Sequence, residues 1–253
     1  QILDSRPPLV PAEQMVQHFI GWEIITPIET FVSDTAILMD FRCDQSRGIH
    51  FIYLLPFSPT RALVESTMFS TKREPDSFFE DAIQKYLEFV YETTDFSVSR
   101  VEKGAIPLGR LPEKNFPYIG IGGNGGAIRP SSGYAFSFIL KQVAVTVKHA
   151  KFLAEKNQNQ SDLIFCSPHK YIDLLMDEIF LTVLRFQPDV APSLFLHMSI
   201  GLAGSEFAMF MNGEATWRLR LKVISVMPKW VFIQAFFAFI CTKLYKFRSD
   251  FGK

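Results

Sequence analysis

The chain has 253 residues, enough for one large domain or two small ones with a buried core. Its 26 Lys and Arg residues balance 26 Asp and Glu residues, so the formal net charge of zero gives no support to nucleic-acid binding. Phenylalanine is abundant, at 26 residues, which suits an ordinary core, the default explanation, or a pocket for a long hydrocarbon.

The cysteines and histidines indicate neither a disulfide framework nor a metal site. Cys43, Cys166 and Cys241 are far apart and form no C-x-x-C pair, and the histidines show no metal-ligand spacing. The first eight residues lack the basic start and apolar centre of a signal peptide. We therefore expect no metal and a reducing, cytoplasmic setting.

Short apolar runs rich in Val, Ile, Phe and Thr fill residues 17–69. They are broken at Thr26-Pro27, Asp34, 44–48 and Ser58-Pro59, which is typical of several strands of an antiparallel sheet.

Pro75 and Asp76 then mark a helix start, and apolar residues recur at helical spacing from Phe78 to Val90. Residues 96–106 alternate as another strand, which ends at Pro107.

The second half is predicted to be mainly helical. Residues 118–132 are rich in Gly, Pro and Ser and indicate a loop. A helix is expected over 133–153, with Ser131 or Ser132 available as its N-cap. A polar break covers 157–162, and the further helices are expected at 171–186, 192–211, 217–226 and 228–246.

The loop 120–126 contains a G-x-G-x-x-G string. A dinucleotide fingerprint needs a helix opening at the third glycine and an acidic residue about twenty positions later. Pro130 delays the helix and the next acidic residue after Gly125 is Glu155, so we reject that interpretation. Two alternatives remain: a plain surface loop, or a loop and helix N-terminus that approach a flat or phosphate-bearing ligand.

Glu65 is a carboxyl between apolar neighbours on a predicted strand. Alternation places Leu63, Glu65, Thr67 and Phe69 on one face. If that face is buried, desolvation raises the pKa of Glu65 and keeps it protonated near neutral pH, ready to donate a proton. If the face is wet, Glu65 is an ordinary solvated residue.

The apolar segment from Trp230 to Cys241 is shorter than the about 20 residues that span a bilayer. With Lys229 before it and Lys243, Lys246 and Arg248 after it, the segment suits a membrane surface. A terminal helix packed on the core is the alternative.

Several segments together resemble the lycopene β-cyclase family of the bacterial and plant type. They occur in the family's order: Met39-Asp40-Phe41-Arg42, Leu55-Pro56-Phe57-Ser58-Pro59-Thr60, Leu63-Val64-Glu65-Ser66-Thr67, Gly104-Ala105-Ile106-Pro107 and Gly125-Gly126-Ala127-Ile128-Arg129-Pro130-Ser131-Ser132-Gly133-Tyr134. Gln17 to Gly21, Asn212-Gly213 and Arg218-Leu219 also look similar, so the resemblance covers nearly the whole chain.

The resemblance implies an α+β flavoprotein of the hydroxylase type. An antiparallel substrate-binding sheet would be followed by a remnant of the FAD-binding domain and a mainly helical C-terminal part. We expect an N-terminally truncated chain without the Rossmann βαβ unit, because Asp4-Ser5-Arg6 looks like the family's D-x-R segment that ends the dinucleotide portion. The expected regions are 1–16, the end of that portion; 17–107, the substrate sheet with one helix; 108–156, the flavin-contacting loop and helix; and 157–253, the helical region.

The same resemblance assigns residues. Glu65 matches the family's catalytic glutamate, and Ser66 stands where the plant form has a second acidic residue. The aromatic residues Tyr53, Phe57 and Phe69 would face substrate, as could Tyr134. The residues expected to contact the flavin are Gly122, Gly123, Gly125, Gly126, Pro130, Ser131, Ser132, Gly133 and Tyr134.

The implied activity is a proton-initiated, non-redox cyclisation of the ψ-ends of lycopene to β-ionone rings, with reduced FAD as cofactor. Because lycopene partitions into membrane, a cytoplasmic protein attached to the membrane surface is expected. Two alternatives stay open: an FAD-dependent oxidoreductase of the same fold, such as a prenyl reductase or epoxidase, and a carotenoid-binding fragment without catalysis.

Overall fold

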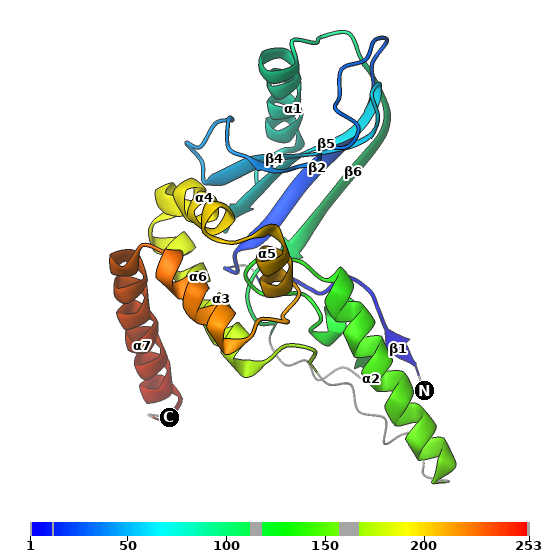
Figure 1. The fold of residues 1–253 in the computed structure, drawn as a ribbon. Helices are drawn as coiled ribbons and strands as arrows, with labels where there is room; N and C mark the ends of the chain where they lie inside the picture. The colour runs from blue at the N-terminus through cyan, green and yellow to red at the C-terminus, as the bar shows by residue number, and fades with distance from the viewer. Residues whose placement is uncertain (1, 12, 112–117, 157–166, 252–253) are drawn as a thin grey trace. The chain divides into compact units, whose positions relative to one another are not determined.

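The computed structural model describes residues 2–11, 13–111, 118–156 and 167–251. Side chains are described up to Cys241. The predicted polar break at 157–162 and Cys166 lie outside the described residues. The chain divides into two compact units, one of residues 12–106 and one of residues 1–11 with 107–253 (Figure 1). Each unit is described separately below.

The first unit is a five-stranded sheet with one helix. Its strands are β2 (Val16–Ile25), β3 (Ile37–Asp40), β4 (Ile49–Ser58), β5 (Arg61–Ser70) and β6 (Ser97–Pro107), in the spatial order β3-β4-β5-β2-β6. The pairs β3 with β4, β4 with β5 and β2 with β5 are antiparallel. The predicted antiparallel sheet is therefore confirmed, as is the helix α1 (Asp76–Tyr91) that follows β5.

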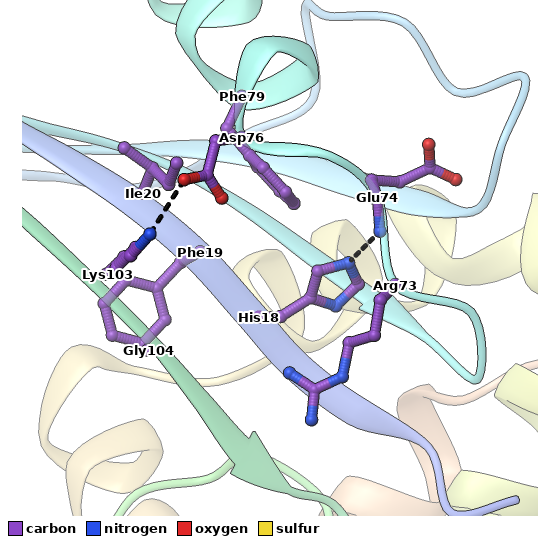
Figure 2. Close-up of a pocket in the computed structure, with 9 residues that line it drawn as sticks. All are labelled: His18, Phe19, Ile20, Arg73, Glu74, Asp76, Phe79, Lys103 and Gly104. Carbon is purple, nitrogen blue, oxygen red and sulfur yellow. Dashed lines mark hydrogen bonds and ion pairs between the residues drawn. The ribbon is translucent and has the colours of Figure 1, made fainter. Parts of the chain in front are cut away.

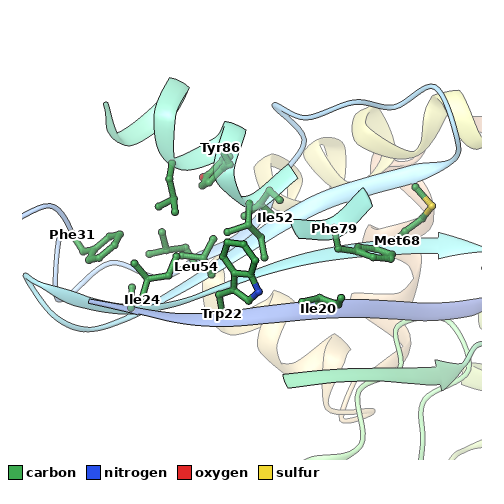
Figure 3. Packing of buried hydrophobic residues seen from close by; sticks show 13 residues of the cluster. Ile20, Trp22, Ile24, Phe31, Ile52, Leu54, Met68, Phe79 and Tyr86 are labelled. Atoms are coloured by element: carbon green, nitrogen blue, oxygen red, sulfur yellow. The ribbon is translucent and has the colours of Figure 1, made fainter. Parts of the chain in front are cut away.

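One face of the sheet is covered by α1 and forms the core of this unit (Figure 3). Every second residue of β5 faces the helix, so Ala62, Val64 and Met68 are fully buried. From α1, Ile83 and Leu87 are also fully buried, four residues apart on one helix face. Burying a side chain of this size stabilises the fold by about 1.5–3 kcal/mol, so this layer fixes which face of β5 turns inward.

The second unit is mainly helical. Its two short strands, β1 (Leu3–Asp4) and β7 (Ile119–Gly120), pair in parallel. They are followed by η1 (Gly122–Gly125), α2 (Phe136–Glu155), α3 (Tyr171–Phe186), η3 (Pro188–Val190), α4 (Ala191–Gly201), α5 (Gly204–Met211), α6 (Trp217–Val226) and α7 (Lys229–Phe251). With the sheet of the first unit, these helices confirm the α+β class.

The helix expected over 192–211 is wrong as a single element, because it divides into α4 and α5. Leu202 and Ala203 are extended. The Glu206 carboxylate then accepts a hydrogen bond from the Ala203 backbone N–H at 2.9 Å, which starts a new helix. The apolar pattern runs across this break, so hydrophobic periodicity does not reveal it.

The expected N-cap of the helix after the glycine-rich loop is also wrong. The helix α2 begins at Phe136, and its N-cap residue, Ala135, makes no side-chain cap. Ser131 instead donates to Asp177, while Ser132 accepts from the Tyr134 backbone N–H. Gly133, with a φ of 70°, turns the chain once more before the helix can start.

Within the described residues, no single helix combines the length and apolar composition needed to cross a membrane. Two bent helix pairs meet both criteria together. They are α3 with residues 188–201, bent by 111°, and α6 with the first part of α7, bent by 109°.

Replacement of Gly201 by Ala should destabilise the second unit by about 1–3 kcal/mol, because an added Cβ would lie 2.5 Å from Val226 Cγ1. The loss should shrink in the double variant with Val226→Ala, which removes the opposing methyl groups. Gly204→Ala is the matched control, since an added Cβ there meets no atom within 4 Å. Urea unfolding of the unchanged protein, the single variants Gly201→Ala and Val226→Ala, the double variant and the control measures these differences. Additive effects of the two substitutions would contradict the contact.

Candidate active site

Glu65 lies on β5, on the sheet face that points away from α1. It is half-buried and pairs with Gly21 of β2 on one side and Tyr53 of β4 on the other. Thr67, two residues along the same face, donates a hydrogen bond from Oγ1 to Glu65 Oε1 at 2.6 Å. The predicted alternation of β5 is confirmed, and Thr67 and Phe69 on this face are buried.

The surroundings of Glu65 favour its neutral form. Desolvation raises the pKa of its carboxyl from 4.5 to about 7; the Thr67 hydrogen bond opposes this rise and the nearby Glu102 adds to it. The repulsion acts across the sheet, since Glu102 belongs to β6. Near neutral pH a large share of the Glu65 carboxyl groups therefore carries a proton.

Aromatic rings line part of the same face. The ring of Phe51 is 5.1 Å from that of Tyr53 and 5.2 Å from that of Phe69, both in edge-to-face contact. Burial, and then the charge of Glu65, raise the pKa of the Tyr53 hydroxyl well above its ordinary value. Phe57 lies apart, 51% exposed near the end of β4, where the Arg61 guanidinium lies 5.4 Å from its ring centre.

Ser66 lies on the other face of the sheet from Glu65 and is fully buried. Its hydroxyl is 2.8 Å from His50 Nε2, and His50 Nδ1 is 2.9 Å from the Asp44 carbonyl. Because a carbonyl only accepts, Nδ1 carries the proton in the neutral ring and Ser66 donates to Nε2. A side chain at position 66 therefore belongs to the α1 side of the sheet and does not reach Glu65.

The glycine-rich loop of the second unit is held by one side chain of α2. Gln142 accepts from the Gly122 N–H and donates to the Gly125 carbonyl, both at 2.8 Å. Gly120 and Gly125 touch through their backbones: a Cβ on Gly125 would lie 2.5 Å from the Gly120 oxygen. Side chains are excluded there, which explains why glycine occupies both positions.

The end of this loop is fixed by a buried ion pair. The Arg129 guanidinium contacts the Asp177 carboxylate of α3 at 3.1 Å and donates to the Phe210 carbonyl at 2.6 Å. Ser131 adds a hydrogen bond to the same carboxylate at 2.7 Å. Since Arg129 and Asp177 are both almost fully buried, removal of either would leave an uncompensated charge.

The loop residues predicted to contact a flavin lie in one continuous segment of the second unit. Pro130, Ser131 and Gly133 are buried, whereas the other six positions are half-buried or exposed. Gly126, with a φ of 75°, has no atom within 4 Å of an added Cβ. A flat ring could approach the backbone there, so the residues present fit a flavin.

A pocket of about 220 Å³ lies elsewhere in the first unit, between β2, β6 and the start of α1 (Figure 2). His18 Nε2 accepts from the Glu74 backbone N–H at 3.3 Å, and Lys103 forms an ion pair with Asp76 at 2.8 Å. Glu65 does not line this pocket. The residues that line it are His18, Phe19, Ile20, Arg73, Glu74, Asp76, Phe79, Lys103 and Gly104.

Comparison with known proteins decides the family. The family model described as lycopene cyclase protein matches residues 1–188, which is more than half of the chain. The chain belongs to the lycopene cyclase family. The expected resemblance is thereby confirmed.

Two curated relatives of this lycopene cyclase chain are both named lycopene beta-cyclase. That of Paracoccus sp. is 30% identical over 131 residues, or 48% of this chain and 33% of the relative. That of Pantoea ananas is 24% identical over 233 residues, or 84% of this chain and 56% of the relative. The chain thus spans about a third to about half the length of these relatives.

Solved structures show more distant likeness. A geranylgeranyl bacteriochlorophyll reductase-like protein from Thermoplasma acidophilum matches with a TM-score of 0.45 at 12% identity, over 86% of this chain and 53% of its own. A flavoprotein/dehydrogenase from Cytophaga hutchinsonii matches with a TM-score of 0.41 at 10% identity, over 83% and 55%.

Two residues of the Glu65 face were missed by the sequence reasoning, Gly21 and Glu102. A glycine inside a strand pattern is a signal of close approach by another group, and it was available in the sequence. Glu102 gave no such signal, because a glutamate on a half-exposed edge strand is ordinary.

The raised pKa of Glu65 predicts a pH-dependent stability. Its folded-state pKa lies above the ordinary value of 4.5, so its contribution is present below about pH 4.5 and is lost as the pH rises through about 7. Glu65→Gln, which never ionises, should gain up to about 3 kcal/mol relative to the unchanged protein over that range. Glu88→Gln, at an exposed position on α1, is the control. A stability difference that stays constant with pH in urea titrations would contradict a desolvated Glu65.

Proposed function

We propose that the protein is a lycopene β-cyclase that converts the ψ-ends of lycopene to β-ionone rings in carotenoid biosynthesis. Membership of the lycopene cyclase family supports the substrate class. The observation that carries the proposal is Glu65, a carboxyl whose pKa is raised to about 7 on a sheet face lined with aromatic rings. A hydrocarbon has no polar functional group, so its reaction must begin with proton transfer from such an acid to a double bond.

The reaction needs one proton in and one proton out. The neutral Glu65 carboxyl gives its proton to a terminal double bond and becomes a carboxylate, leaving a tertiary carbocation on the substrate. An internal double bond attacks the cation and closes the six-membered ring. Transfer of a ring proton to a base, for which the Glu65 carboxylate is available, then gives the β-ionone end and restores the neutral acid. The product is an isomer of the starting material, so no electron is gained or lost overall.

The surrounding side chains suit a cationic intermediate. Rings of Tyr53, Phe51 and Phe69 offer faces worth about 0.5–2 kcal/mol each to a cation, without a nucleophile that would trap it. Burial keeps the Tyr53 hydroxyl protonated, so it does not compete as a base. The carboxylate that Glu65 becomes is itself held by the Thr67 hydroxyl, which favours its release of the proton.

The cofactor we propose is FAD in its reduced form. Residues 122–126 and 130–134 would hold it, because the backbone there is kept open by glycine and fixed by Gln142 and Asp177. When bound, reduced flavin would supply negative charge that stabilises a cation. The N-terminus of α2 adds the positive end of a helix dipole behind the loop.

Glu65→Gln should abolish ring formation while leaving flavin bound. The full-length protein and its variants would be expressed in a lycopene-accumulating host, and carotenoids separated by chromatography, with flavin absorbance of the purified protein as the second readout. Loss of at least about a hundredfold in product is expected, the scale of removing a general acid. Glu88→Gln, far from this face on the exposed side of α1, should keep full activity.

Other outcomes identify the rivals. Persistent lycopene with the unchanged full-length protein would remove the cyclase proposal. Flavin-dependent turnover that survives Glu65→Gln would indicate the reductase or epoxidase alternative, and bound but unchanged carotenoid would indicate the non-catalytic one.

We also propose a cytoplasmic location with attachment to a membrane surface through α7. Trp230, Ile233 and Phe237 recur at helical spacing and are 69%, 46% and 62% exposed. A row of large apolar side chains beside the charge of Lys229 suits the headgroup region of an anionic bilayer.

The double variant Trp230→Ser with Phe237→Ser should bind vesicles of phosphatidylcholine and phosphatidylglycerol at least about tenfold more weakly than the unchanged protein. Flotation of the full-length protein with the vesicles measures this. Phe89→Ser, which removes a 76% exposed ring from α1, is the matched control and should float as before. Equal flotation of the double variant would contradict attachment through α7.

A further inference from the structure

Gly21 leaves a gap between two carboxyl groups. The strand β2 lies between β5 and β6, and Gly21 of β2 pairs directly with Glu65 of β5. A Cβ added to Gly21 would point to the Glu65 face, since directly paired residues share a face. That Cβ would lie 3.1 Å from Glu102 Cγ and 3.4 Å from Glu102 Oε1. The Glu102 side chain of β6 therefore leans over Gly21 on the side of the sheet where Glu65 lies.

The gap is also apolar. Leu63 Cδ1 would lie 3.2 Å from the same Cβ, so a leucine and the stem of Glu102 share the space above Gly21. Gly21 itself is buried, and Glu65 and Glu102 on either side of it are half-buried. A charge on one carboxyl is therefore felt by the other more strongly than it would be in open solvent.

No cation balances this pair within the described residues. The next carboxylate along β2 is Glu23, which forms an ion pair with Arg61 at 2.6 Å. The charge of Arg100 also lowers the pKa of Glu23. Glu102 from β6 is the charged group that raises the pKa of Glu65, Tyr53 of β4 pairs directly with it, and its hydrogen-bond partner is the neutral Thr67. The two carboxyl groups thus lie near each other, and neither forms an ion pair with a described side chain.

We propose that Glu102 is a positioning residue for Glu65: its carboxylate, lying over Gly21, disfavours a second negative charge and so keeps Glu65 in the neutral, proton-donating form. The effect of Glu102 on catalysis rests on the proposed function, whereas its effect on the protonation of Glu65 does not. Position 66, where the plant form has a second acidic residue, is Ser66 here and points to the opposite face of the sheet. In this chain the second carboxyl group on the Glu65 face is Glu102, which comes from another strand.

The test compares Glu102→Gln with the unchanged full-length protein and with Glu102→Asp. Infrared difference spectra against Glu65→Gln isolate the C=O band of the protonated Glu65 carboxyl, which is followed as a function of pH. In Glu102→Gln the midpoint of that band should fall below that of the unchanged protein, because the repelling charge is gone while the larger cause, desolvation, remains. Glu102→Asp keeps the charge and should retain a higher midpoint than Glu102→Gln.

Activity supplies the second readout. Because Glu65 must be protonated to act, the alkaline limb of the kcat/KM profile should move to lower pH in Glu102→Gln, by the same amount as the infrared midpoint. A purely structural role of Glu102 would lower activity at every pH without moving the limb. Glu88→Gln should move neither.

The results separate the two proposals. A Glu65 midpoint that is the same in Glu102→Gln and in the unchanged protein would overturn the role of Glu102 and leave the cyclase proposal standing. A shifted midpoint in a full-length protein that forms no cyclic carotenoid would support the coupling of the two carboxyl groups while the cyclase proposal fails.

Discussion

The alternation of side chains along β5 is the constraint on which the active-site face depends. Ala62, Val64 and Met68 turn toward α1, because they belong to the hydrophobic cluster that the sheet and this helix bury together. Glu65 is then obliged to face the other way, between Gly21 and Tyr53. A slip of one residue would place the carboxyl against the helix, so the hydrophobic core decides where the acid lies.

The sequence predicted this part of the fold well, because its signals are local. Strand alternation fixed the face of Glu65, and Pro75 with Asp76 marked the start of α1. The wrong N-cap and the overlooked Glu102 arose where a distant partner decides the structure. Ser131 is a good N-cap by type, yet Asp177, 46 residues away, takes its hydroxyl. Glu102 is likewise ordinary in sequence and becomes notable only through Gly21 on the neighbouring strand.

The glycine-rich loop shows how an irregular segment is kept rigid. Backbone hydrogen bonds close its turns, such as that from the Ala127 N–H to the Gly122 carbonyl. Two helices that follow it in sequence add side-chain hydrogen bonds, from Gln142 of α2 to the loop backbone and from Ser131 of the loop to Asp177 of α3. The side chains of Gln142 and Asp177 are almost fully buried, so solvent does not compete for these hydrogen bonds. A loop fixed in this way loses little conformational entropy when a ligand settles on it.

The helix α3 carries a second buried ion pair one turn before the first. Asp173 accepts from Arg220 of α6 at 2.8 Å, and Asp177 accepts from Arg129 of the glycine-rich loop. Two carboxylates on one face of α3 thus connect a segment near residue 129 to another near residue 220. Opening of α3 would strand two guanidinium groups at once, so these distant segments must exchange their amide hydrogens as one cooperative block instead of fraying separately.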